Sequence, residues 1–136
     1  MNLFSIRLRL LITLLCADTQ APIKYQRRQS DSVFITGTTD EYIKITKSGV
    51  AEGRFMTPSE SEGGRPVCII GCDVATNLFR GESPLGKRVR LGDSSFEVIG
   101  VLEKQGSFLG AISLDNQAII PLRQFTRVFY EYPDYT

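Results

Sequence analysis

The chain has 136 residues, of which 42% are hydrophobic and 23% are charged. This size and composition suit one globular domain with a modest core and exclude an intrinsically disordered chain. Sixteen basic and fifteen acidic residues leave a net charge of +1, so the basic footprint of a nucleic-acid-binding protein is absent.

The first 32 residues are an atypical leader and linker. Residues 10–17 form an apolar run after Arg7 and Arg9, which weakly resembles a secretory signal sequence. The run is much shorter than the about 20 residues that a membrane-spanning helix needs. Residues 20–32 are polar and basic, which is typical of a linker or of an exposed strand.

The elements that follow are short. Residues 33–36 are β-branched and aromatic and end at Gly37, a pattern that predicts a strand. Apolar side chains within residues 42–45 follow N-cap-forming residues and predict one helical turn. Residues 50–54 are weakly extended. Residues 57–66 are so rich in turn-forming residues that we expect a surface loop.

The middle of the chain has the clearest patterns. Residues 67–70 are a continuous apolar run, which is typical of a strand covered on both faces. Apolar side chains within residues 74–79 fall on one helical face and predict a helix. A loop at 80–86 leads to alternating residues at 88–91 and 96–102, which predict a β-hairpin.

The sequence of the last part of the domain predicts a loop, a strand and a helix. Residues 104–115 form the loop, which contains two glycines and the apolar pair Phe108 and Leu109. Residues 117–120 predict a strand. The apolar spacing within residues 122–129 predicts a short amphipathic helix.

Together these elements predict an α+β fold, in which short helices pack on a mixed β-sheet. The clearest part has the order strand, helix, hairpin, strand and helix. We place the domain at residues 33–129, after the leader and linker at 1–32 and before a C-terminal tail at 130–136.

The segment GESPLGKR at residues 81–88 is close to the phosphate-binding P-loop pattern. A P-loop needs a strand before it, a helix after it, and a Ser or Thr after its lysine. Here a predicted helix precedes the segment, a predicted strand follows it, and Arg88 replaces the hydroxyl. We therefore interpret it as a connection in which Gly81 and Gly86 adopt positive φ angles.

The sequence contains no recognisable catalytic or ligand-binding arrangement. The chain has no histidine, so the commonest general base and metal ligand is missing. Cys16, Cys68 and Cys72 are too few for a zinc site or a disulfide scaffold, and Cys68 and Cys72 are expected to fill small apolar sites. Carboxylate pairs such as Glu60 and Glu62 lie in polar stretches, where we expect them to be solvated. We predict a protein that is not an enzyme, with no catalytic, cofactor or metal site.

The remaining candidate site is the apolar loop tip formed by Phe108 and Leu109. We interpret this tip as a contact for a partner. This feature predicts a binding or mechanical module, and nucleic acid is not expected among its partners.

An ordered series of motifs resembles the MacB-like periplasmic core domain of ABC-transporter permeases of the MacB/FtsX type. The series begins with Gly53-Arg54-Phe55 and a polar acidic loop, and continues with the strand and helix at 67–79. It then contains PLGKRV at 84–89, FEVIGV at 96–101, a glycine-rich loop at 106–110 and IPL at 120–122. The resemblance covers roughly residues 33–129.

This resemblance implies a non-catalytic domain on the periplasmic face of the bacterial inner membrane. In such permeases the domain is joined to transmembrane segments, and ATP is hydrolysed by a separate cytoplasmic domain or subunit. The resemblance further implies an adaptor protein and a homodimer as partners. Domain motion would then couple ATP hydrolysis to export or to lipoprotein release.

The chain also departs from the family pattern. We find no transmembrane segment in the sequence, and residues 1–32 stand where the family has a longer first part of the domain. We therefore expect a fragment with an exposed sheet edge, at which the missing strands would pair. The alternative interpretation is a free-standing module that binds a protein or a ligand and has no role in transport.

Overall fold

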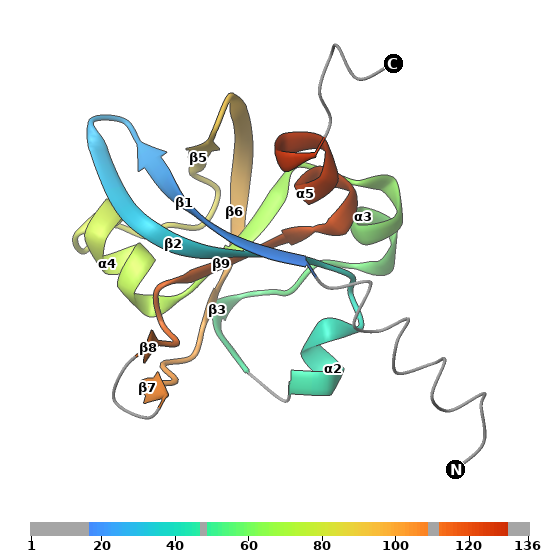
Figure 1. Ribbon diagram of the computed structural model, residues 1–136. Coiled ribbons are helices and arrows are strands. Elements are labelled where there is room, and N and C mark those ends of the chain that lie inside the picture. The colour runs from blue at the N-terminus through green and yellow to red at the C-terminus, as the bar shows by residue number, and fades with distance from the viewer. Residues whose placement is uncertain (1–16, 47–48, 109–111, 131–136) are drawn as a thin grey trace.

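The computed structural model describes residues 17–46, 49–108 and 112–130, which fold around one main β-sheet (Figure 1). The signal-like run up to residue 16 and the tail beyond Tyr130 lie outside the described residues.

The main sheet has seven strands in the order β3-β6-β4-β9-β2-β1-β5, and β5 also pairs with β6. The sheet is mixed, since β2 pairs with β9 and β4 pairs with β6 in parallel, whereas the other pairs are antiparallel. The strands are β1 (Ala17–Tyr25), β2 (Arg28–Thr38), β3 (Val50–Gly53), β4 (Val67–Ile70), β5 (Arg88–Leu91), β6 (Ser94–Leu102) and β9 (Gln117–Pro121).

Short helices pack against this sheet, as the predicted α+β fold requires. The helices of the described residues are α2 (Tyr42–Thr46), α3 (Pro58–Gly63), α4 (Cys72–Phe79) and α5 (Leu122–Phe129). In Figure 1, α4 lies on the left, α3 and α5 lie on the right, and α2 lies at the lower edge.

The sheet closes on itself because β6 pairs with three other strands. The first residues of β6 pair with β5, its middle pairs with β4, and its end pairs with β3. In turn, β5 pairs with β1 through Ile23 with Leu91 and Lys24 with Arg90. Strands β6, β4, β9, β2, β1 and β5 therefore form a closed barrel, to which β3 is added as an edge strand.

This closure corrects, at the end of β1, the expectation of an exposed edge at the N-terminal side of the sheet. Residues 20–32, for which the sequence allows a linker or an exposed strand, form strands in the structure. They belong to the β1–β2 hairpin, which is paired along most of its length. Strand β1 pairs with β5 at Ile23 and Lys24, so the end of β1 lies between two strands, whereas its first residues pair with β2 alone. Strand β2 also runs through the boundary that we place between residues 32 and 33.

The main hydrophobic core fills the inside of the barrel. Alternate strand residues such as Ile35 on β2 and Val98 on β6 are fully buried there. Leu78 of α4 and Phe125 of α5 belong to the same cluster, so these helices cover the barrel interior. The burial of these apolar side chains is the main favourable contribution to folding.

A second, smaller core lies on the outer face of the sheet. All four residues of β4 are buried, as its continuous apolar run predicts, and they alternate between the two cores. Tyr42 and Ile43 of α2 pack against this outer core. Its buried members are Met56, Val67, Ile69, Ile99, Leu102 and Ile119.

Helix α3 replaces the surface loop that we predict for residues 57–66. Thr57 is the N-cap, and its side-chain oxygen accepts a hydrogen bond from the backbone N–H of Glu60 at 3.2 Å. Glu60 in return accepts a hydrogen bond from the backbone N–H of Thr57 at 2.9 Å. This capping box, with Pro58 in the first turn, satisfies helix-end donors and outweighs the loop-like composition.

Glu60 is also not the solvated carboxylate that we expect from the sequence. Arg54 donates two hydrogen bonds to it, at 2.7 and 2.9 Å, so the ion pair ties α3 to the end of β3. The Arg54 guanidinium lowers the pKa of Glu60 from 4.5 to about 2. Glu62, the other member of the pair, is exposed.

The segment at residues 81–88 is a connection, as predicted. It joins α4 to β5, so a helix precedes it and a strand follows it. Gly81 and Gly86 have φ angles of 99° and 81°, in the region that favours glycine. The surroundings that a P-loop needs are therefore missing.

Replacing Glu60 with Gln should lower the free energy of unfolding at pH 7 by about 1 kcal/mol, since the Arg54 side of the pair is half exposed and screened by solvent. A carboxyl whose pKa is lowered in the folded state stabilises the protein above its unfolded pKa near 4.5. That contribution disappears as the pH falls to about 2. Urea denaturation between pH 7 and about pH 2 should show the difference between wild type and variant shrinking to zero. Glu62→Gln is the control, and a difference that persists at the acidic end contradicts the assignment.

Replacing Lys24 with Glu should stabilise the closed barrel by about 0.5 kcal/mol, because it puts opposite charges in place of two like charges on neighbouring strands. Thermal and urea unfolding measure the change. Lys44→Glu on α2, an exposed site with the same change of charge, should leave stability nearly unchanged. A loss of stability in Lys24→Glu would contradict the pairing of β1 with β5.

Candidate partner-binding site

A two-stranded arm leaves the barrel between β6 and β9 (Figure 1). Its strands are β7 (Ser107–Phe108) and β8 (Ile112–Ser113), which pair antiparallel with Phe108 opposite Ile112. At the base, the backbone N–H of Leu114 donates to the carbonyl of Gly106 at 2.8 Å. The arm occupies the segment that we predict as a loop at 104–115.

The carboxylate of Asp115 fixes the base of this arm. It accepts hydrogen bonds from the backbone N–H groups of Gln105 at 2.7 Å and Gly106 at 3.0 Å. Asp115 is only 3% exposed, and both bonds are partly buried. Hydrogen bonds to an ionised acceptor are stronger than those between neutral groups. The turn into β7 therefore has a defined position relative to β9.

The same residue joins the arm to helix α4. The backbone N–H of Asp73, in the first turn of α4, donates to the carbonyl of Asp115 at 3.0 Å. The hydroxyl of Ser113 donates to the carboxylate of Asp73 at 2.9 Å. A Cβ atom on Gly71 would lie 2.3 Å from the Asp115 carbonyl oxygen, so the close contact requires glycine at this position.

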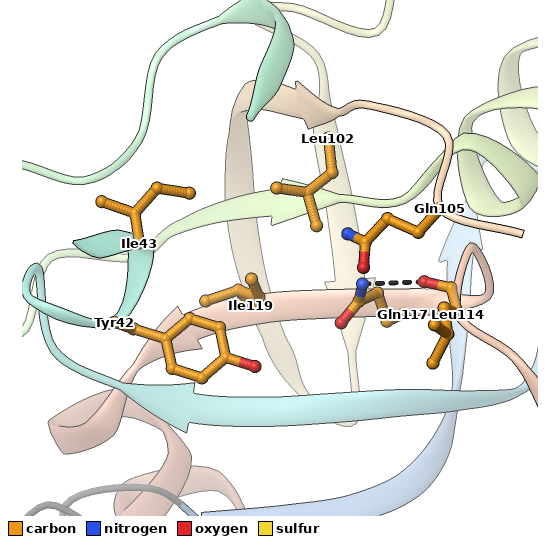
Figure 2. Close-up of a pocket in the computed structure, with 7 residues that line it drawn as sticks. All are labelled: Tyr42, Ile43, Leu102, Gln105, Leu114, Gln117 and Ile119. Atoms are coloured by element: carbon orange, nitrogen blue, oxygen red, sulfur yellow. Dashed lines mark hydrogen bonds between the residues drawn. The ribbon is translucent and has the colours of Figure 1, made fainter. Parts of the chain in front are cut away.

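An apolar pocket of about 360 Å³ opens beside the arm on the outer face of the sheet (Figure 2). Its wall includes Leu114 and Gln117, and the side-chain amide of Gln117 donates to the Leu114 carbonyl at 2.7 Å, the dashed line in Figure 2. Helix α2 contributes the opposite side. The lining residues are Tyr42, Ile43, Leu102, Gln105, Leu114, Gln117 and Ile119.

A smaller pocket of about 230 Å³ continues this hollow and shares Leu114 and Gln117 with it. Its other lining residues are Asp18, Phe34, Thr36 and Ser113. We call the two pockets together the outer groove. It runs from α2, past the base of the arm, to the start of β1, and its lining is largely apolar with a few amide, hydroxyl and carboxylate groups.

The two cysteines of the described residues, Cys68 and Cys72, have raised pKa values. Both have free thiols, and Cys68 is buried. Burial raises the pKa of Cys68 to about 12 and also raises the pKa of Cys72. Because the thiolate is the nucleophilic form, these raised pKa values disfavour the reactive form of both groups. Cys72 makes a contact of 3.4 Å with the Leu102 carbonyl, so it serves as a packing group.

The described residues contain no cluster of three or more His, Cys, Asp or Glu side chains suited to a metal ion. Of the two predicted contact residues, Phe108 belongs to β7, although the structure does not describe its side chain. Leu109 lies outside the described residues. Their role as a contact stays a prediction. The sequence does not reveal the role of Asp115 at the base of the arm, because an Asp-Asn pair in a polar context indicates only a turn.

Several known proteins resemble this chain. The MacB-like periplasmic core domain family matches residues 12–135. The macrolide export ATP-binding/permease protein MacB of Syntrophobacter fumaroxidans is 33% identical over 87 residues, which are 64% of this chain and 12% of that protein. The pyoverdine export ATP-binding/permease protein PvdT of Pseudomonas aeruginosa is 32% identical over 88 residues, with coverages of 65% and 13%.

Two solved structures share the fold. The extracellular domain of the noncanonic ABC-type transporter YknZ from Gram-positive bacteria matches with a TM-score of 0.72 and 28% identity, over 85% of this chain and 56% of that one. The periplasmic region of MacB from Actinobacillus actinomycetemcomitans matches with a TM-score of 0.72 and 17% identity, over 86% and 50%.

The fold and these matches define a periplasmic domain of the ABC-transporter permease class. This chain belongs to the MacB-like periplasmic core domain family. It spans only 12% and 13% of the length of the two curated relatives. Among the described residues, no helix combines the length and the hydrophobicity needed to cross a membrane.

Replacing Asp115 with Ala should destabilise the chain by about 1.5–3 kcal/mol, because two partly buried backbone N–H groups lose a charged acceptor. Asp115→Asn keeps one acceptor oxygen and should lose less. Urea denaturation measures the stability, and amide hydrogen exchange at Gln105 and Gly106 should accelerate in the Ala variant before the core exchanges. Asp93→Ala, at an exposed turn, is the control. Unchanged exchange at these two amides would show that Asp115 does not hold the arm.

Proposed function

We propose that this chain is a non-catalytic part of the periplasmic domain of an ABC exporter, and that it acts by binding partners and by moving with them. The family match supports the class of protein. The observation that carries the mechanism is the anchoring of the arm by Asp115 beside the outer groove. Such a site can hold a partner segment.

In this proposal the chemical energy comes from elsewhere in the transporter. ATP is hydrolysed in a separate cytoplasmic domain or subunit, which acts on this domain through the transmembrane segments of the permease. The names of the relatives describe export of macrolides or of pyoverdine. For this chain we propose export or lipoprotein release as the process, without a particular substrate.

We further propose that Phe108 and Leu109 at the arm contact an adaptor protein or the second copy in a permease homodimer. The base of the arm is bonded both to the turn into β7 and to the first turn of α4. A displacement of the arm would therefore be passed to α4, which packs on the barrel core. This connection is what a domain that transmits motion needs.

A chimeric transporter tests this function. The region of this chain that matches the Syntrophobacter relative replaces the corresponding region of that protein, and ATP hydrolysis and macrolide export are measured in cells and membranes. We expect export to be retained. Asp115→Ala in the chimera should reduce export while ATP hydrolysis continues, because the arm is displaced and the ATPase is elsewhere. ATP hydrolysis by the purified chain alone would contradict the proposal.

The double substitution Phe108→Ser and Leu109→Ser tests the proposed contact. We expect export by the chimera to fall several-fold with little change in the amount of folded protein, because truncation of an apolar contact residue costs binding energy and leaves the fold intact. Ile45→Ser on α2 is the matched control, since Ile45 is an apolar side chain that is 52% exposed. Equal export by the arm variant and the control would remove the arm tip from the interface.

A further inference from the structure

The outer wall of the barrel carries two facing cations at the point of closure. Lys24 on β1 lies directly opposite Arg90 on β5, in one of the two residue pairs that join these strands. Both side chains are exposed, and within the described residues neither forms an ion pair. Like charges in directly opposite positions repel each other, so this part of the surface is not arranged for stability alone.

The neighbouring residues extend this arrangement into a polar row. Gln29 on β2 pairs with Lys24, and Ser95 on β6 pairs with Arg90, so four adjacent strands present these side chains side by side. Arg88 is exposed on the same face of β5, since the residue between it and Arg90 is buried. We call Lys24, Arg88 and Arg90 the basic seam.

We propose that the basic seam is a docking surface for carboxylate side chains of a partner protein. A carboxylate placed between Lys24 and Arg90 would relieve their repulsion and accept hydrogen bonds from both. Gln29 and Ser95 lie on either side of the two cations, and Arg88 donates a hydrogen bond to the Ser95 hydroxyl at 3.4 Å. The proposal is independent of the function proposed for the arm, because the seam and the arm lie on different parts of the barrel (Figure 1).

The carboxylates around the seam favour a protein partner over a lipid surface. Glu97 lies opposite Arg88 on β6, and Asp93 is exposed in the turn between β5 and β6. Asp31 is exposed on β2 and accepts a hydrogen bond from the side chain of Gln29. An anionic membrane would repel these three acids together. A protein can place its own acidic groups opposite the cations and its basic or polar groups opposite the acids.

Titration of the isotope-labelled chain with a hexaglutamate peptide, followed by two-dimensional NMR in low-salt buffer, tests the proposal. We expect the largest shift changes at Lys24, Arg90 and the residues that pair with them. Lys24→Gln with Arg90→Gln should weaken binding by about fivefold or more, since each exposed charge pair contributes modestly. Binding should also weaken steeply with added salt. Lys44→Gln on α2 removes one exposed cation far from the seam and should bind like the wild type (Figure 1).

The double variant removes a repulsion, so it should fold at least as well as the wild type, which a dispersed NMR spectrum verifies. The single variant Lys24→Gln should show a smaller loss of binding and provides the same test if the double variant is unstable. Shift changes confined to other surfaces, or equal binding by the wild type and both variants, would overturn the proposal. Binding to phosphatidylglycerol vesicles without binding to hexaglutamate would overturn it in favour of a membrane surface.

Discussion

Strand β6 is shared by three neighbours, and this sharing is the constraint on which the rest of the structure depends. Its first part holds β5, and β5 carries the sheet across to β1. The β1–β2 hairpin then returns through β9 to β4, which pairs with β6 again. The closed circuit encloses the main core and leaves a separate outer face, on which the second core and the outer groove lie.

The parts of this structure with strong local patterns could be predicted from the sequence. The buried strand β4, the helix α4 and the hairpin of β5 and β6 each have a characteristic spacing of apolar residues, and all three are present. Helix α3 was missed although Thr57 and Glu60 have the spacing of a capping box, because the surrounding glycines, serines and prolines favour a loop. The predicted strand at residues 33–36 is the second part of β2, whereas polar side chains left residues 20–32, in β1 and the start of β2, open between a linker and an exposed strand.

Closure of the barrel and the role of Asp115 could not be read from local patterns. The pairing of Ile23 with Leu91 joins residues far apart in the chain, and nothing in either segment alone specifies its partner. Asp115 is distinguished by its burial and by the hydrogen bonds that its carboxylate accepts from two backbone N–H groups. Both features arise from tertiary packing, which explains why motif resemblance indicated the family but indicated no site.

The physical arrangement agrees with a domain that works through contacts. The arm and the outer groove lie together at one end, and the basic seam lies at the closure of the barrel on β1 and β5. All three are attached to the same main sheet. The family to which the chain belongs supplies the setting for such contacts, a periplasmic domain of an ABC-transporter permease.

The most direct test of this account is a measurement of the contact between β1 and β5, since the relative positions of the arm, the outer groove and the basic seam depend on this contact. Nuclear Overhauser effects measured on the labelled chain report whether the backbone protons of Ile23 and Leu91 lie close together. The account predicts clear cross-strand effects for this pair and slow amide exchange along β1. Absence of these effects, together with fast exchange of the β1 amides in an otherwise folded chain, would contradict the closed barrel.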